Sequence, residues 1–442
     1  MISMPDAVVH GTIDTGAAQE IGATRQGRLM VDSAFSAGSV DAFERLRVSA
    51  PQTLFDSFHR FTDNGLWATA TASGGAAVFN ANQGLVDLNV TSASGSEVLR
   101  ETRKVFPYQP GKSLRVDCSF VFNSPKPGLR QRAGYFDSQN GHFVEMTDSA
   151  SGFCFVERSF VTGSVVETKV SRLGGVYGVS DTGWNYDRLD GSGPSKIVLD
   201  PTASQIFALD LEWLGVGTAC VGFYINRRFI PCHLFNHANI VKTTYTTTAC
   251  LPLRYEITNT SATTGASTLK QICSTVISEG GYELRGAPGT IGQAIGSPYS
   301  LAVAATRYPI VALRLKAAQL NSIVVPTAAY LMGVGNNHAY KWEVVTDCSI
   351  TDGAWVSAGA NSSLEYNMTG TAVVGGAARA SGFFSSSNQS TAMANVLRDQ
   401  FLGLQLERDP FTATPSVFAL IASSDTASSS VYGSVDWEQV TH

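Results

Sequence analysis

The chain has 442 residues, of which 44% are hydrophobic and only 15% charged, and its net charge is −5. This length exceeds what one ordinary core fills, so we expect two or three domains. The apolar fraction excludes general disorder. The Lys and Arg residues are scattered along the sequence, which argues against a nucleic-acid-binding surface. The sequence contains no apolar run of about 20 residues, so we do not expect it to insert into a membrane.

The N-terminal segment, residues 1–45, is rich in Gly, Ala and Ser and shows no sustained apolar period. It predicts an extended arm. Docking of the arm on neighbouring subunits and a simply flexible terminus both remain open. The segment lacks the basic and apolar regions of an export signal, so we expect the chain to fold in a cytoplasm.

Residues 46–285 repeat apolar side chains at every second position, which is the pattern of β-strands. In the segment 206–214, Leu209 and Leu211 are expected to face a core, while Asp210 and Glu212 face the opposite side. Gly, Pro and Asn turn signals separate such runs at short intervals. Residues 46–285 therefore predict a larger antiparallel β-sandwich domain of the jelly-roll or lectin-like type.

A Gly- and Pro-rich segment, residues 280–298, predicts a linker. The period-two pattern then returns, in segments that include 311–315, 341–345, 401–406 and 416–421. Residues 286–442 thus predict a linker and a smaller C-terminal β domain. Only Thr391–Gln400 carries a weak helical pattern, and there helix and strand remain open. The fold class we expect is all-β, with two antiparallel β-sandwich domains preceded by an arm.

Seven cysteines, an odd number with no CxxC pair, indicate buried free thiols in a reducing compartment. They are Cys118, Cys154, Cys220, Cys232, Cys250, Cys273 and Cys348.

A zinc site can be considered at Cys232, His233 and His237, because thiolate and imidazole at short spacing share this metal. However, strand alternation would put Cys232 on one face and both histidines on the other, and a fourth ligand is missing nearby. We predict no metal site.

Nucleotide-binding motifs are incomplete. Gly111-Lys112-Ser113 resembles the end of a phosphate-binding loop, but Phe106 stands where that loop requires glycine. Gly215-Val216-Gly217 is followed by Cys220 where a dinucleotide fingerprint needs glycine or alanine. We therefore predict no cofactor.

Asp210 and Glu212 are the best enzymatic candidates, because residues i and i+2 of a strand lie on one face, roughly 6–7 Å apart. Carboxylates at that separation can act in glycoside hydrolysis. No third acid follows them, since the strand continues Trp213-Leu214-Gly215. A polar outer sheet face is the favoured interpretation, so we predict no catalytic residues and no enzyme.

The loop 179–190 carries Trp184, Asn185, Tyr186 and Asp187, which together offer an aromatic stacking face with hydrogen-bonding edges. This composition suits contact with a glycan. Core plugs and subunit contacts use the same residue types, so both alternatives stay open.

Several strings resemble virion structural proteins of tailed bacteriophages from aquatic and marine environments, over about residues 41–282 and more weakly beyond. The strings are Asp41–Ser49 with Thr53–Asp56, Leu211–Gly217, His233–Asn239, Leu253–Ile257 and Leu269–Tyr282.

The resemblance implies a virion protein made in the host cytoplasm, namely a tail-associated subunit (fibre, sheath-like or tail-tip) in a symmetric oligomer. Its partners would be copies of itself and other virion proteins. Capsid decoration, host recognition through a surface glycan and glycan degradation remain as alternatives. No catalytic residue is carried over.

Overall fold

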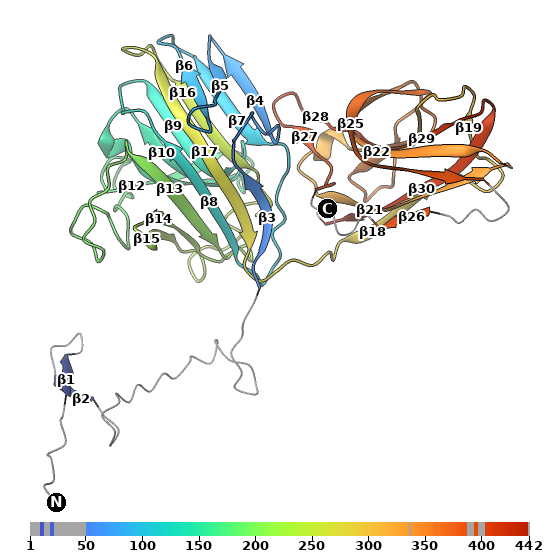
Figure 1. Cartoon of the computed structure of the whole chain (residues 1–442). Coiled ribbons are helices and arrows are strands. Elements are labelled where there is room, and N and C mark those ends of the chain that lie inside the picture. Colours follow the sequence, from blue (N-terminus) through green and yellow to red (C-terminus); the bar gives the residue numbers. More distant parts are fainter. Residues whose placement is uncertain are drawn as a thin grey trace, which may run out of the picture. The chain divides into compact units, whose positions relative to one another are not determined.

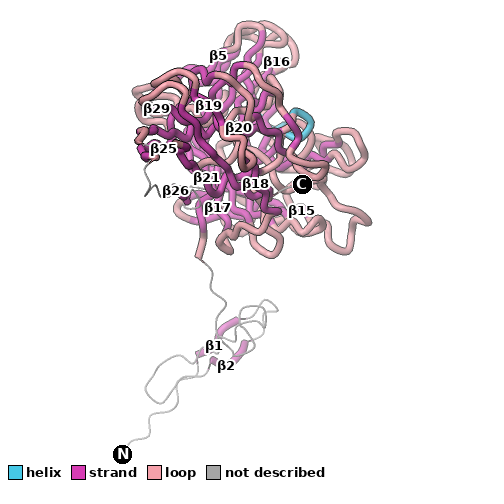
Figure 2. Tube along the Cα trace, turned by 90° about the vertical axis from the view of Figure 1, so that its right-hand side faces the viewer, coloured by secondary structure: helices cyan, strands magenta, loops and turns pink. Residues whose placement is uncertain are grey.

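The computed structural model describes residues 50–386, apart from 336, and residues 403–440, with three further strands as backbone. This described part contains no α-helix, only the 3-10 turns η1 (Ala150–Gly152) and η2 (Ala317–Gln319). Figure 2 shows that strands and loops make up nearly all of the trace. The chain is all-β with antiparallel sheets, as predicted, and none of its described helices could span a membrane.

The chain divides into two compact units, Met1–Ala50 and Pro51–His442. In the first, β1 (Val9–Thr12) pairs with β2 (Ala18–Ile21) in an antiparallel ladder that the sequence did not predict. The rest of the predicted arm, residues 1–45, lies outside the described residues.

The larger sandwich is formed by a seven-stranded and an eight-stranded sheet (Figure 1). The first, in spatial order, contains β12 (Val166–Ser171), β11 (Cys154–Ser159), β10 (Gly141–Thr147), β9 (Leu129–Phe136), β16 (Leu253–Asn259), β7 (Glu97–Thr102) and β4 (Trp67–Ala72). The second contains β15 (Arg228–Phe235), β14 (Ala219–Ile225), β13 (Ser204–Leu211), β8 (Leu114–Val121), β17 (Ser267–Ser278), β6 (Leu85–Val90) and β5 (Ala76–Asn80), and β3 (Gln52–Ser57) pairs with β17.

The smaller sandwich is formed by a five-stranded and a six-stranded sheet. The five-stranded sheet runs β18 (Ala287–Gly292), β30 (Ser429–Gln439), β21 (Val324–Val334), β26 (Met393–Val396), and β19 (Tyr299–Leu301) pairs with β30. The six-stranded sheet runs β23 (Val356–Ser357), β24 (Leu364–Asn367), β20 (Tyr308–Leu315), β29 (Phe418–Ser424), β22 (Ala339–Thr351), β25 (Ala372–Ser385), and β27 (Arg408–Asp409) pairs with β28 (Thr414–Pro415) outside it.

Each sandwich encloses its own large apolar core. In the larger core the alternation predicted for β13 is confirmed: Leu209 and Leu211 are buried, Asp210 is half-buried and Glu212 is exposed. All seven cysteines are free thiols, as predicted, although Cys273 is exposed. Residues 51–442 nevertheless form one compact unit, so the division into two domains near residue 285 stays a prediction.

The linker predicted for residues 280–298 is wrong over Ala287–Gly292, which is the edge strand β18 paired with β30. Pro288 is tolerated because an edge strand leaves one row of backbone groups unpaired. Gly289 is required because a Cβ there would lie 2.5 Å from the indole of Trp437. Glycine and proline thus mark an edge strand under an aromatic ring.

For Thr391–Gln400, where the sequence leaves helix and strand open, the structure has strand β26, and the other residues of the segment lie outside the described part. One smaller prediction is wrong. The strand predicted for 401–406 is absent over the described residues 403–406, where the backbone turns.

Candidate functional site

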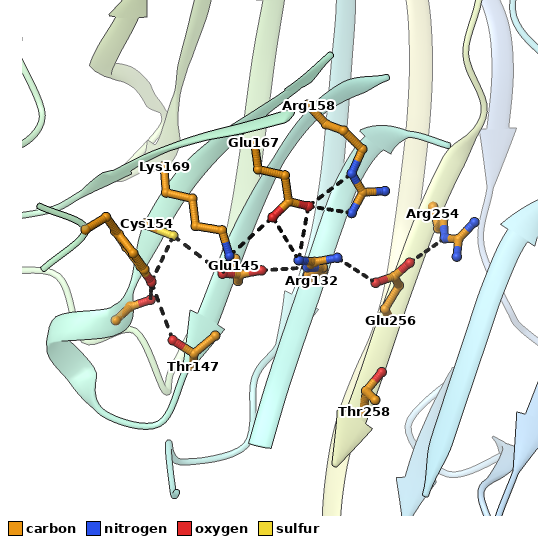
Figure 3. Close-up of polar contacts among 12 residues, drawn as sticks. Arg132, Glu145, Thr147, Cys154, Arg158, Glu167, Lys169, Arg254, Glu256 and Thr258 are labelled. Atoms are coloured by element: carbon orange, nitrogen blue, oxygen red, sulfur yellow. Dashed lines mark hydrogen bonds and ion pairs between the residues drawn. The ribbon is translucent and has the colours of Figure 1, made fainter. Parts of the chain in front are cut away.

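The outer side of the seven-stranded sheet carries a layer of paired charges, which we call the charged face (Figure 3). It combines five basic and four acidic side chains from six neighbouring strands and β27. They are Arg132, Arg158, Lys169, Arg254, Arg408, Glu101, Glu145, Glu167 and Glu256.

Arg132 on β9 is the centre of this layer. Its guanidinium donates to Glu145 at 2.6 Å, to Glu167 at 3.2 Å and to Glu256 at 3.4 Å. Lys169 binds Glu145 at 2.7 Å from the other side. Three carboxylates from different strands therefore share one guanidinium.

The layer continues across β16 and β7. Arg254 donates to Glu256 at 2.6 Å and to Glu101 at 2.9 Å. Glu101 also accepts from Arg408 at 2.6 Å. The side chains of Glu101 and Arg408 are 2% and 1% exposed, so this end of the layer is shielded from water.

Aromatic rings separate the cations within the layer. The guanidinium of Arg158 lies 5.3 Å from the ring centre of Phe136 and 5.0 Å from that of Phe143. Arg132 lies 5.0 Å from Phe143. Such cation–π contacts add to the ion pairs where water is excluded.

Ion pairing keeps two acids of the charged face, Glu167 and Glu256, ionised, whereas burial raises the pKa of Glu101 despite its contacts with Arg408 and Arg254. Burial opposes ionisation of Glu167, but Arg132, Arg158 and Lys169 outweigh it and lower the pKa of Glu167 to about 2. The pKa of buried Glu256 is also lowered, by Arg254 and Arg132. General acid catalysis needs a carboxyl that holds its proton near neutral pH, and these two do not. The arrangement fits structural support better than proton transfer.

A second polar cluster lies on the core side of β10 and β11. Glu157 accepts hydrogen bonds from His142 at 3.1 Å and from His237 at 2.9 Å. The other ring nitrogen of His237 lies 2.6 Å from the carbonyl oxygen of Gly217. Because carboxylate and carbonyl oxygens only accept, both ring nitrogens of His237 must donate, so the ring is an imidazolium. It stacks on Tyr245 with centroids 3.7 Å apart.

The ion pair between His237 and Glu157 predicts that the stability of the fold depends on pH. Burial lowers the pKa of His237, but its bond to Glu157 outweighs burial and raises the pKa above the usual 6.5. The contribution of His237 to the free energy of unfolding is therefore fully present below pH 6.5, and it is lost as the pH rises through the raised pKa of His237. Despite burial, His142 and His237 lower the pKa of Glu157 from 4.5 to about 2, so its contribution is lost as pH falls through about 2.

We expect His237→Gln to lower the free energy of unfolding by about 1.5–3 kcal/mol, the range for charge-assisted hydrogen bonds, between about pH 4.5 and 6.5. The difference from the unsubstituted protein should shrink above and below this window. Urea unfolding at a series of pH values measures it, with His338→Gln as the control. A difference that stays constant from pH 4 to pH 9 contradicts the assignment.

The structure contradicts the predicted glycan contact at Trp184. Its ring is 2% exposed, stacks on Phe155 at 4.4 Å, and its indole N–H donates to the carbonyl oxygen of Val170 at 3.1 Å. Asp187 is also buried and accepts from the backbone N–H groups of Leu189 and Ser195.

The two remaining candidates of that loop lie nearer the surface. Asn185 is exposed, and its side chain bonds twice to the backbone of Leu234, at 3.0 and 2.9 Å. Tyr186 is 55% exposed. The four residues thus do not form a common stacking face.

Cys232, His233 and His237 have separate partners. The Cys232 thiol lies 3.3 Å from the carbonyl oxygen of Ile230, and His233 accepts from the backbone N–H of Asn185. His237 binds Glu157. Within the described part of the chain, no three His, Cys, Asp or Glu side chains are grouped to hold a metal ion.

Asp210 lies on the outer side of the eight-stranded sheet, whereas Glu212 follows the end of β13 at Leu211. Burial, together with the nearby charges of Glu279, Glu212 and Asp117, raises the pKa of Asp210, and Arg115 opposes them. A raised pKa suits a general acid, but neither Asp210 nor Glu212 lines the grooves of about 330 and 620 Å³ in the described part of the chain. Their catalytic role remains a hypothesis.

Glu157 and its two histidines were missed from the sequence. His142 and Glu157 are 15 residues apart and His237 is 80 residues further on, so no motif joins them. One signal was present: Glu157 follows Phe155 by two positions, which places an acid on the core-facing side of a strand. A buried acid needs a partner.

No family model and no curated protein matches the chain. Among solved structures, it is similar to the xyloglucan PUL GH43B protein of Bacteroides ovatus, at 10% identity and a TM-score of 0.30, over 59% of this chain and 46% of that chain. The chain thus spans about half the length of that protein.

Two further similar structures cover about half of this chain. A carbohydrate esterase of the Shiga toxin-encoding bacteriophage phi24B matches at 10% identity and a TM-score of 0.28, over 52% of this chain and 100% of that chain. A Bacillus licheniformis β-glucanase matches at 13% identity and a TM-score of 0.28, over 50% of this chain and 97% of that chain. The likeness is one of β-sandwich fold type and assigns no activity to this chain.

Proposed function

We propose that the chain is a structural subunit of a tailed-bacteriophage particle, tail-associated, that assembles with copies of itself. The phage assignment rests on the strings of residues 41–282 that resemble virion proteins. The assembly role rests on one structural observation, an exposed apolar groove on the outer side of the eight-stranded sheet.

This assembly groove has a volume of about 330 Å³ between β3, β8, β13 and β17. Its lining residues are Asp56, Ser57, Phe58, Asp117, Ser119, Ile206, Cys273, Ser274 and Thr275. Phe58 is 62% and Ile206 44% exposed. Large exposed apolar side chains that gather in a groove mark an interaction surface.

A second copy of this chain is the occupant we propose. Oligomers of identical subunits are the commonest assemblies of soluble proteins, and their interfaces have apolar centres. The low charge of the chain, 15% of residues, limits repulsion between identical surfaces. The lowered pKa values of Glu167 and Glu256 on the charged face support a role of these two acids in structure and not in catalysis.

Ile206→Asp should convert the assembly into monomers, because it places a charge in the apolar groove at an exposed position outside the core. Sedimentation velocity on the full chain measures this. Val166→Asp, an equally exposed position on β12 of the other sheet, is the control and should leave the oligomer intact. A monomeric unsubstituted chain at micromolar concentration, or an oligomer unaffected by Ile206→Asp, contradicts the proposal.

A further inference from the structure

A second groove, of about 620 Å³, lies along β18, β30 and β21 in the smaller sandwich. We call it the β18–β21 groove. Its lining residues are Pro288, Gly289, Thr290, Thr327, Ala328, Tyr330, Asp436, Trp437 and Glu438.

Strand register arranges these residues in rows across the three strands. Thr290, Asp436 and Ala328 are direct cross-strand partners and form the middle row. Tyr330 lies one row to one side, and Pro288 with Glu438 one row to the other. Rows on one face are two residues apart, about 6.8 Å, so the outer rows are separated by about 13–14 Å. An elongated ligand of that length fits along the strands.

One irregularity of the sheet shapes this groove. The register of β21 against β30 shifts between Pro326 and Ala328, which makes Thr327 an extra residue in a β-bulge. Bulges re-aim side chains and occur beside functional sites.

The polar side chains of the groove have unused hydrogen-bonding capacity. None of Thr290, Thr327, Tyr330 and Asp436 makes a side-chain hydrogen bond or ion pair with another described residue, and Asp436 and Tyr330 are half-buried. The charged face is the opposite case, because its acids are bound by arginine and lysine. Half-buried polar groups without protein partners, beside an aromatic ring, are what a binding site offers to a ligand.

The chemistry of the lining selects the ligand class. A tyrosine ring offers an apolar face with a hydroxyl at its edge, a carboxylate accepts two hydroxyl hydrogen bonds, and threonine hydroxyls both donate and accept. Among the described residues, no Lys or Arg lines the groove, while Asp436 and Glu438 do. Uronic acids, sialic acids, sulfates and phosphates would therefore meet uncompensated negative charge.

We propose that the β18–β21 groove binds a neutral oligosaccharide, with Tyr330 stacking on one sugar ring and Asp436 holding hydroxyls of the next. This site is separate from the assembly groove and from the loop around Trp184, and it does not depend on the virion role.

Isothermal titration calorimetry on the full chain tests the proposal with neutral tetrasaccharides as probes: β1,3- and β1,4-glucan, α1,4-glucan and α-mannan. At least one should bind, and Asp436→Asn and Thr290→Val should each weaken it by tenfold or more. Both changes preserve side-chain size, so the fold should persist. Tyr330→Ala should abolish the binding, provided that its unfolding curve stays cooperative.

Thr351→Val, at an exposed threonine in the other sheet of the same sandwich, is the matched control and should bind as the unsubstituted chain does. Galacturonan and chitosan tetramers serve as acidic and cationic comparisons. Absence of binding to all four neutral probes, binding unchanged in Asp436→Asn and Thr290→Val, or tighter binding of either charged tetramer overturns the proposal. None of these results bears on self-association, which is measured separately.

Discussion

Replacing Trp184 with alanine is expected to lower the free energy of unfolding by about 3–5 kcal/mol, the range for truncating large buried aromatic residues. Trp184 stacks on Phe155 and lies 6.2 Å from Phe223 in the larger core. Its indole N–H also bonds to the carbonyl oxygen of Val170, which the substitution would leave unsatisfied. Urea or guanidinium unfolding followed by circular dichroism measures the loss.

Tyr186→Ala is the matched control, because this side chain belongs to the same loop and is 55% exposed. It should change the free energy of unfolding by less than about 0.5 kcal/mol, as surface substitutions usually do. If Trp184→Ala is as stable as the unsubstituted protein, the ring is not in the core, and the sequence-based expectation of an exposed stacking face returns.

Arg132→Met should destabilise the fold by about 3 kcal/mol, the lower end of the range for breaking a buried ion pair. Methionine keeps the aliphatic packing but removes the cation shared by Glu145, Glu167 and Glu256. The lower end applies because Lys169 still binds Glu145 and Arg254 still binds Glu256. The same unfolding experiment measures the change.

Arg285→Met provides the comparison, since its ion pair with Glu283 is fully on the surface and screened by water. No measurable loss is expected there. A second comparison is pH: the penalty of Arg132→Met should fall in acid as the carboxylates take up protons. Equal effects of the two substitutions would show that the charged face contributes no more than a surface ion pair.

The all-β class could be predicted because apolar alternation is a local property. In β17 the burial pattern follows the sequence nearly residue by residue, apart from the bulge between Gln271 and Ser274. Strand pairing is not local: β16 lies between β9 and β7, and 116 residues separate the end of β9 from the start of β16. Sequence alternation carries no signal for such partners.

The charged face escaped prediction for a related reason. β16 reads as an alternating strand with Arg254 and Glu256 on the side expected to meet water, yet all seven of its residues are buried. Alternation identifies the two sides of a strand but not what covers each side. The polar side is shielded because neighbouring strands supply opposite charges at matching registers, as where Glu256 pairs with Arg132 in the ladder.

Local composition leaves the place of Trp184 open between a glycan contact and a core plug, and it predicts a linker at the β18 segment. The structure buries Trp184 and Asp187, while Tyr186 is exposed. Glycine and proline at Pro288 and Gly289 were read as a linker, but they meet the needs of an edge strand packed under Trp437. In both cases tertiary contacts override the local composition.

Quantitative mass spectrometry of phage particles purified from cells that produce this chain tests the proposed function most directly. We predict that the chain co-purifies with intact particles through a density gradient, at a fixed copy number per particle that is a multiple of the oligomer found in sedimentation. Absence from washed particles, or presence only at trace, variable levels, would contradict a structural role in the virion.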